Sequence, residues 1–398
     1  MIARSRELLD ADGLPPIEML RGALEEHMES VPRLDMLARV YEGKNAILRR
    51  ARPEGLPNNR IAHPFARYIV AVATGYMVGN GVTYREEAES EAFSEVMQAY
   101  RRGNMASVDA ENAKSASIFG RGVEYVHLDA DGTPHATSLD PRQAFVVYDD
   151  TYDMEPLFGV YIAPIRTASG AQEGVRMWVM GESAVMRLRA DSVSASEFVL
   201  EEISPHFFGG VPLVEYWNDE HEKGDFEWVI PLIDAYDRLQ SDRMNDKDQF
   251  VDALLVLTGC TLETDARGRE PWRQLREDKA ICLPDTGAGA NYLHNQMDEQ
   301  GNQILRDALA EDIHRFSMVP DLSDEHFAQN ASGVAMRYKL WGLEQLTAVK
   351  RQWFEEGLRA RLKLMLQYYS LRGYRLPDAR DISVCFTSAL PPAEEAEG

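Results

Sequence analysis

The feature that most constrains this fold is a long predicted helix that has no apolar face over half its length. Asp225 is a good N-cap residue, and the pattern after it predicts a helix over 225–251. Between Leu239 and Phe250, however, the only apolar residue is Met244. A helix that is polar nearly all round does not belong in the core of a monomer. It must either stand in solvent or line a wet surface formed by several subunits.

Two more long helices are predicted in the second half of the chain. The first covers about 298–318, where leucine and isoleucine recur at helical spacing, and the second covers about 333–371. The composition of 319–332 is typical of a loop. In the last helix Lys and Arg outnumber Glu, which makes it basic within an acidic chain.

The first half combines helices with a β-rich module. Helices are expected within 1–57, over 60–78 and from Glu86 to about Tyr100, and alternating residues predict antiparallel strands across 120–217. The fold class is therefore α+β, mainly helical.

The charge of the chain limits its partners. It has 42 Lys and Arg against 65 Asp and Glu, a formal net charge of -23. A protein that grips nucleic acid over a broad surface needs clustered cations, so that class is disfavoured, whereas a protein that lets DNA slide past without sticking is allowed. No apolar run is long enough for a membrane span, no secretory signal is visible, and no membrane partner is expected.

The sequence offers little for catalysis. Three scattered cysteines form no CxxC pair, which fits a reducing compartment, and no phosphate loop, HExxH or GxSxG motif is present. We therefore expect no enzyme activity, no cofactor, no catalytic residue and no metal ligand. The alternative left open is a metal-dependent hydrolase that uses the acidic loop Asp149–Glu155, although an exposed acidic turn explains the same residues.

Several ordered segments resemble the phage portal protein family found in long-tailed phages of Gram-positive bacteria. Taken together they span about residues 40–370 in the order of that family. The segments are Tyr41–Leu48, Pro57–His63, Thr74–Tyr84, Val147–Pro156, Gly210–Gly259 and Val319–Glu344.

The resemblance implies a portal fold with an α/β wing, a two-helix stem, a small α/β clip, a tunnel loop and a long wing/crown helix. In this chain those parts fall as follows: wing 1–224, with a helical start and β-rich 120–217; stem helix 225–251; clip 252–297; second stem helix 298–318; tunnel loop 319–332; long helix 333–372; short or vestigial crown and disordered tail 373–398.

The same resemblance implies a function and a set of partners. The chain would form a ring of about twelve copies at one capsid vertex, around a channel for double-stranded DNA during packaging and ejection. The partners implied are the terminase large subunit, a head-completion adaptor, and the major capsid and scaffolding proteins. The expected location is the virion, with the host cytoplasm as the site of assembly. The other alternative is a monomeric head-morphogenesis factor, which would share the capsid context but form no ring.

Three groups of residues are the candidate site. The tunnel-loop residues expected to face DNA are Asp321, Ser323, Asp324, Glu325, His326, Gln329 and Asn330. The stem residues expected to face the channel are Gln240, Asp242, Arg243, Asn245, Asp246, Asp248 and Gln249. The basic residues that are candidates for contacts between subunits are Arg337, Lys339, Lys350 and Arg351, with a solvated helix face as the equally weighted alternative.

Overall fold

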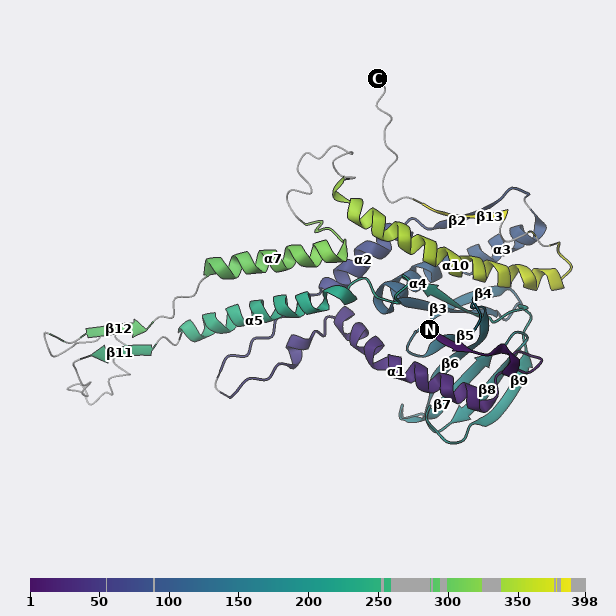
Figure 1. Ribbon diagram of the computed structural model, residues 1–398, viewed down its shortest axis with the longest axis horizontal. Helices are drawn as coiled ribbons and strands as arrows, with labels where there is room; N and C mark the ends of the chain where they lie inside the picture. The colour runs from purple at the N-terminus through teal and green to yellow at the C-terminus, as the bar shows by residue number, and fades with distance from the viewer. Residues whose placement is uncertain are drawn as a thin grey trace, which may run out of the picture. The chain divides into compact units, whose positions relative to one another are not determined.

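The computed structural model divides the chain into two compact units (Figure 1). It describes residues 1–54, 56–88, 90–251, 254–258, 287, 289–293, 299–323, 338–375, 377 and 381–387, with the backbone alone described at 249–251, 254–258 and 290–293. The large unit consists of Met1–Asn45, His63–Ile233 and Asp312–Gly398. The small unit consists of Ala46–Ala62 and Asp234–Glu311.

A six-stranded sheet forms one part of the large unit, and all neighbouring strands in it are antiparallel except the first pair. Its order is β1-β5-β6-β7-β8-β9, and β1 runs parallel to β5. The strands are β1 Ile2–Arg4, β5 Ala144–Asp149, β6 Pro156–Arg166, β7 Gln172–Met180, β8 Ala184–Ala190 and β9 Val199–Pro205.

Strand β5 shows why this part of the chain packs in layers. All six of its residues are buried, and the first five, Ala144 to Tyr148, alternate between two apolar clusters. Phe145 and Val147 join a cluster with Leu20 and Leu24 of helix α1 (Ile17–Tyr41). The intervening residues of β5 point to the other face and meet Leu213 of β10 (Leu213–Trp217). Since side chains alternate along a strand, one sheet is covered on both faces.

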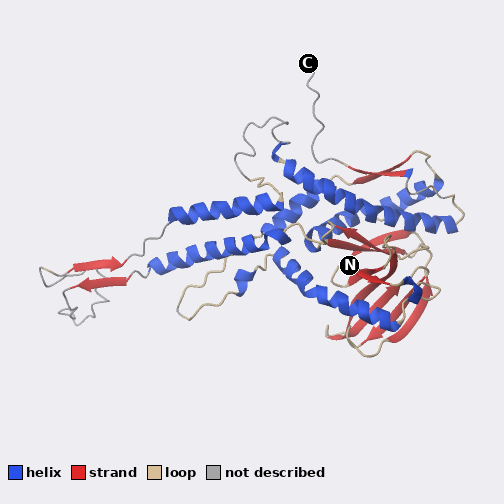
Figure 2. Cartoon of the chain, in the orientation of Figure 1, coloured by secondary structure: helices blue, strands red, loops and turns tan. Residues whose placement is uncertain are grey.

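The second sheet has the order β10-β3-β4, and helices cover it. Its further strands are β3 Arg121–Leu128 and β4 Pro134–Leu139. The core against it is built from helices α2 Phe65–Val78, α3 Glu91–Arg102, α4 Met105–Phe119 and α10 Trp341–Leu371, as Figure 2 shows. A two-stranded sheet of β2 Val82–Glu86 and β13 Ile382–Phe386 packs into the same core.

Gly357 lets α10 approach the sheet closely. A Cβ atom built at this position would lie 2.5 Å from Cδ1 of Tyr216, far inside van der Waals contact. Tyr216 is fully buried, and its ring lies 4.7 Å from that of Phe354 on α10. A larger residue at 357 would therefore push the helix off the sheet.

A buried arginine on α10 ties four elements together. Arg361 is 0% exposed, and its guanidinium lies 2.7 Å from Oδ1 of Asp109 on α4 and 3.0 Å from Oε2 of Glu124 on β3. It also donates hydrogen bonds to the hydroxyls of Tyr100 and Tyr84, at 3.2 and 3.1 Å. A buried charge is tolerated only when it is paired and hydrogen-bonded, so this network fixes α10 against the sheet.

A second buried ion pair is formed by Lys350, which precedes Arg361 on the same helix. Nζ of Lys350 is 2.5 Å from Oδ2 of Asp225, and both side chains are almost fully buried. Asp225 also accepts hydrogen bonds from Ser117 and Asn218. The prediction that Asp225 caps a helix is therefore wrong, because its carboxylate is held by Lys350 instead. Helix α5 (Ile230–Val251) begins after a short 3-10 turn over Glu227–Val229.

The mixed α/β class and the strands expected across 120–217 are confirmed, while the region just before them differs from the prediction. The acidic helix starts at Glu91 rather than Glu86, because Ser90 caps it by accepting a hydrogen bond from the backbone N–H of Phe93. Residues Val82–Glu86 form β2 instead, paired with β13 from the far end of the chain. Helix α4 was not predicted.

The small unit contains a pair of strands that lies between two helices in the sequence. Helix α5 continues into it to Val251, strands β11 (Leu254–Thr258) and β12 (Gly289–Leu293) pair in antiparallel fashion, and helix α7 (Glu299–Ser317) follows. The helices predicted over 225–251 and 298–318 are thus present with slightly shifted starts. Most of the predicted clip, 252–297, lies outside the described residues, as do 333–337 and the tail beyond 387.

Replacing Arg361 should destabilise the large unit strongly. In Arg361→Leu two buried carboxylates lose their cation, and breaking a buried pair in this way costs roughly 3–5 kcal/mol. Urea unfolding measures the change, and Lys363→Ala, an exposed lysine on the same helix, is the control expected to stay within about 0.5 kcal/mol of wild type. Equal stability of the two variants would contradict the structural role given to Arg361.

His27 should make the protein sensitive to acid. The ring is 1% exposed and stacks on Phe145, and burial together with the charge of Arg121 lowers the pKa of His27 from 6.5 to about 4. As pH falls from 6.5 towards 4, the unfolded chain binds a proton that the folded chain does not. The free energy of unfolding should therefore fall with decreasing pH, by up to about 1.4 kcal/mol per pH unit from this residue.

The measurement is urea unfolding at several pH values for wild type and His27→Gln. The variant removes this titration, so its stability should depend less on pH below 6.5, although it is less stable at pH 7. Parallel pH profiles for the two proteins would show that His27 does not titrate as described.

Candidate functional site

The polar half of α5 packs against an irregular segment of its own chain, the loop Ala46–Ala62. The side-chain carbonyl of Asn245 accepts hydrogen bonds from the backbone N–H of Asn59 at 2.6 Å and from its side-chain amide at 3.1 Å. One turn away, Ser241 accepts a hydrogen bond from the backbone N–H of Ile61 at 3.0 Å. Ser241 and Asn245 are both 0% exposed. Polar side chains are needed on this face because they satisfy backbone groups of a segment that has no secondary structure there.

Two arginines of the same loop hold one carboxylate of α5. Nη1 of Arg50 lies 2.8 Å and Nη2 of Arg52 lies 2.5 Å from Oδ1 of Asp242. All three side chains are partly exposed, so the ion pairs are screened and position the loop more than they stabilise it.

The other side of α5 contacts α7. Arg243 and Lys247 both reach Glu299 at the start of α7, through a hydrogen-bonded ion pair and a 4.0 Å contact respectively. The α5 helix of the small unit is therefore covered by the loop on one face and by α7 on another.

These contacts change the expectation for the stem residues. Asn245 is fully buried beneath residues 59–61, so it does not face a channel, and Asp242 is held by two arginines. Asp246 and Asp248 are exposed, Gln240 and Arg243 are half-buried, and the side chain of Gln249 lies outside the description. The helix is polar because its side chains bind the loop and also meet solvent. The sequence had indicated two other possibilities, a helix that stands in solvent or one that lines a wet surface between subunits.

The described start of the predicted tunnel loop is anchored by a tyrosine of α2. The hydroxyl of Tyr68 donates a hydrogen bond to the carbonyl of Pro320 and accepts one from the N–H of Leu322, both at 2.8 Å. Asp321 accepts hydrogen bonds from Ser323, and these lower its pKa although partial burial acts to raise it. The anchor Tyr68 was not predicted. The other residues proposed for this loop lie outside the described part of the chain: Asp324, Glu325, His326, Gln329 and Asn330.

The basic residues of the long helix mostly act within the subunit. Lys350 is buried with Asp225, so its expected role between subunits is wrong for a simple reason: it is not accessible. Arg351 lies 3.8 Å from Glu344 and donates a hydrogen bond to a backbone carbonyl of α2. Lys339 is exposed, and Arg337 lies outside the described residues.

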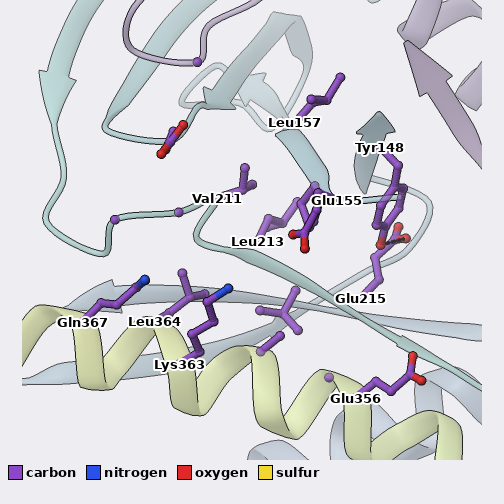
Figure 3. A pocket seen from close by; sticks show the side chains of 18 of the residues that line it. Tyr148, Glu155, Leu157, Val211, Leu213, Glu215, Glu356, Lys363, Leu364 and Gln367 are labelled. Atoms are coloured by element: carbon purple, nitrogen blue, oxygen red, sulfur yellow. Dashed lines mark hydrogen bonds between the residues drawn. The ribbon is translucent and has the colours of Figure 1, made fainter. Parts of the chain in front are cut away.

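A cavity of about 360 Å³ lies in the large unit between α10 and strands β5, β6 and β10 (Figure 3). Glu155, Glu356 and Lys363 line it beside apolar side chains such as Leu157 and Leu213. Its described lining includes no cysteine, serine or histidine, and its titratable groups are carboxylates, the amine of Lys363, the guanidinium of Arg6 and the hydroxyl of Tyr148.

The acidic loop Asp149–Glu155 next to this cavity has a structural explanation. Asp149 accepts hydrogen bonds from the backbone N–H groups of Thr151 and Glu155 and from the Thr151 hydroxyl, and these contacts lower the pKa of Asp149. Its carboxylate thus closes the turn. Within the described residues, no group of three or more His, Cys, Asp or Glu side chains could hold a metal ion. No described helix is long and apolar enough to cross a membrane.

With this geometry in view, the comparisons with known proteins define the class. The family model for "Phage portal protein, SPP1 Gp6-like" matches residues 23–397. The chain belongs to this family, which confirms the resemblance seen in its sequence.

Two curated relatives are portal proteins. The chain is 22% identical over 325 residues to the portal protein of Bacillus phage SPP1, covering 79% of this chain and 62% of that protein. It is 22% identical over 370 residues to the portal protein of Clostridium phage phiCD119, covering 84% of this chain and 79% of the relative. A solved structure, described as the neck of an empty GTA particle computed with C6 symmetry, is 13% identical with a TM-score of 0.48, covering 90% of this chain and 85% of that one.

Removing the buried amide of α5 should loosen the loop. Asn245→Ala leaves the buried N–H of Asn59 without its acceptor, which costs about 1–3 kcal/mol. Hydrogen exchange of the Asn59 and Ile61 amides should become faster, whereas Asp246→Ala, an exposed neighbour on the same helix, should leave it unchanged. Unchanged exchange in Asn245→Ala would mean that this contact does not hold the loop.

Proposed function

We propose that this chain is a portal subunit, and that about twelve copies form a ring at one capsid vertex around a channel for double-stranded DNA. The observation that carries the proposal is the family match over residues 23–397. In this assignment α5 and α7 form the stem, the segment containing β11 and β12 forms the clip, and residues 319–332 form the tunnel loop. Residues 1–224 form the wing.

The charge of the chain supports passage of DNA rather than binding. Each subunit carries a formal net charge of -23, so a ring of such subunits has no net attraction for a polyanion, and DNA can slide through it without being trapped. On α5 the exposed carboxylate of Asp246 is a remaining candidate for a side chain that faces the channel, whereas Asp248 accepts a hydrogen bond from the side-chain amide of Asn59 in the loop.

The role proposed is structural, without a reaction of its own. The terminase large subunit would supply the energy for packaging and dock on the clip, and a head-completion adaptor would occupy the same end afterwards. The major capsid and scaffolding proteins would surround the wing. The protein would be assembled in the host cytoplasm and remain in the virion.

Neither alternative is favoured. Within the described residues, the loop Asp149–Glu155 offers no group of three or more side chains placed to hold a metal ion, and Asp149 is engaged by its own turn and by Arg6. The family match over residues 23–397 favours a portal subunit over a monomeric head-morphogenesis factor.

Positive charge in the tunnel loop should slow DNA passage. In Asp324→Lys/Glu325→Lys two carboxylates predicted to lie near DNA become cations that attract phosphates. The amount of DNA packaged per capsid in a fixed time, measured with the cognate motor, should fall several-fold at low salt and recover partly at higher ionic strength. Asp131→Lys, at an exposed turn of the large unit, is the control. Normal packaging by assembled rings of the loop variant would contradict the role given to this segment.

A further inference from the structure

The small unit is built in three layers, with α5 in the middle. Successive residues of a helix are turned by about 100°, which puts Ser241, Asn245 and Asp248 on one face of α5 and Arg243 and Lys247 on the opposite face. The first face contacts the loop Ala46–Ala62 and the second contacts α7. Figure 1 shows α5 between these two segments. The loop and α7 therefore form the two outer surfaces of the unit.

The outer surface of the loop is apolar and basic. Leu48 and Leu56 are 37% and 48% exposed, so both present apolar surface to solvent. The loop contains four arginines and one glutamate, and two of the arginines, Arg49 and Arg60, are exposed. This is a local concentration of positive charge in a strongly acidic chain.

The outer surface of α7 is apolar and acidic. Ile304 and Leu305 are 64% and 50% exposed, and the exposed Asp307, Ala308 and Glu311 continue the surface along the helix. Asp307 and Glu311 are one turn apart and share a face with Ile304. Between Glu299 and Glu311 there are three acidic residues and one arginine.

We propose that the outer surface of the loop of one subunit packs against the outer surface of α7 of the next copy of this chain. The inference rests on the ring proposed above and names the surfaces that build it. Exposed apolar side chains meet on both sides, and arginines of one subunit face carboxylates of the other. Contact between two like surfaces would bring arginine against arginine or carboxylate against carboxylate. The charges thus favour a head-to-tail contact, which closes into a ring, over a two-fold dimer.

This arrangement also indicates which residues of α5 line the channel. If the loop and α7 surfaces contact neighbouring copies, the channel is faced by an edge of α5 that neither layer covers. Asp246 lies on one such edge and Gln240 with Met244 on the other. Asp242 and Asn245 then position the loop at the contact between subunits instead of lining the channel.

A charge swap tests the contact. Arg49→Glu/Arg60→Glu puts acid against acid, and Asp307→Lys/Glu311→Lys puts base against base. Each double variant should weaken association between subunits about tenfold at low salt, as measured by the ring fraction in mass photometry over a concentration series. The quadruple variant restores opposite charges with reversed signs, and it should recover most of the ring fraction.

The control is Arg101→Glu/Arg102→Glu, which makes the same charge change at exposed positions at the end of α3 and should leave ring formation as in wild type. Rescue in the quadruple variant separates a contact from misfolding, because a damaged loop is not repaired by a change on α7. Unaffected rings in both double variants, or no rescue in the quadruple variant, would overturn the assigned surfaces while the portal function stands. A wild-type chain that forms no rings would overturn the proposed function and this contact with it.

Discussion

The large unit depends on one buried cation. Arg361 lies at 0% exposure on α10, yet its partners come from α4, β3, and the tyrosines of β2 and α3. Removing any partner leaves a charge without compensation in an apolar core, so the network demands that all these elements be in place together. Lys350 and Asp225 repeat the arrangement along the same helix. Helix α10 is thereby fixed against the sheet β10-β3-β4 and against helices α3 and α4.

Local patterns predicted the strands from β3 to β10 because alternating residues, or short apolar runs bounded by turn residues, lie within each strand's own sequence. The features that were missed depend on distant partners. Helix α4 buries Asp109 and Asn112, which serve Arg361 and Glu124, so it shows no apolar stripe. The local sequence around Asp225 is typical of a helix cap. In the structure its carboxylate pairs with Lys350, 125 residues away, which no local pattern could predict. Lys350 on α10 was expected to be solvated or to meet another subunit, and its burial against Asp225 reverses that expectation.

The polar half of α5 shows the same limit at the candidate site. Its composition excluded a packed apolar core, which is right, but it could not distinguish a channel from a polar contact within the subunit. Asn245 and Ser241 serve the loop at residues 59–61, and Asp242 holds its arginines. What the sequence did establish is the class, because the ordered segments of the family are spread over most of the chain and do not depend on any one contact.

The central claim is that copies of this chain close into a ring whose channel is lined by α5. Electron cryomicroscopy of the purified, concentrated protein tests it most directly. The account predicts closed rings with a central hole, an uncovered edge of α5 facing that hole, and the loop Ala46–Ala62 against α7 of the next copy. Rings lined by a different element, or a protein that stays at the 44.9 kDa mass of one subunit even with its capsid and scaffolding partners present, would contradict it.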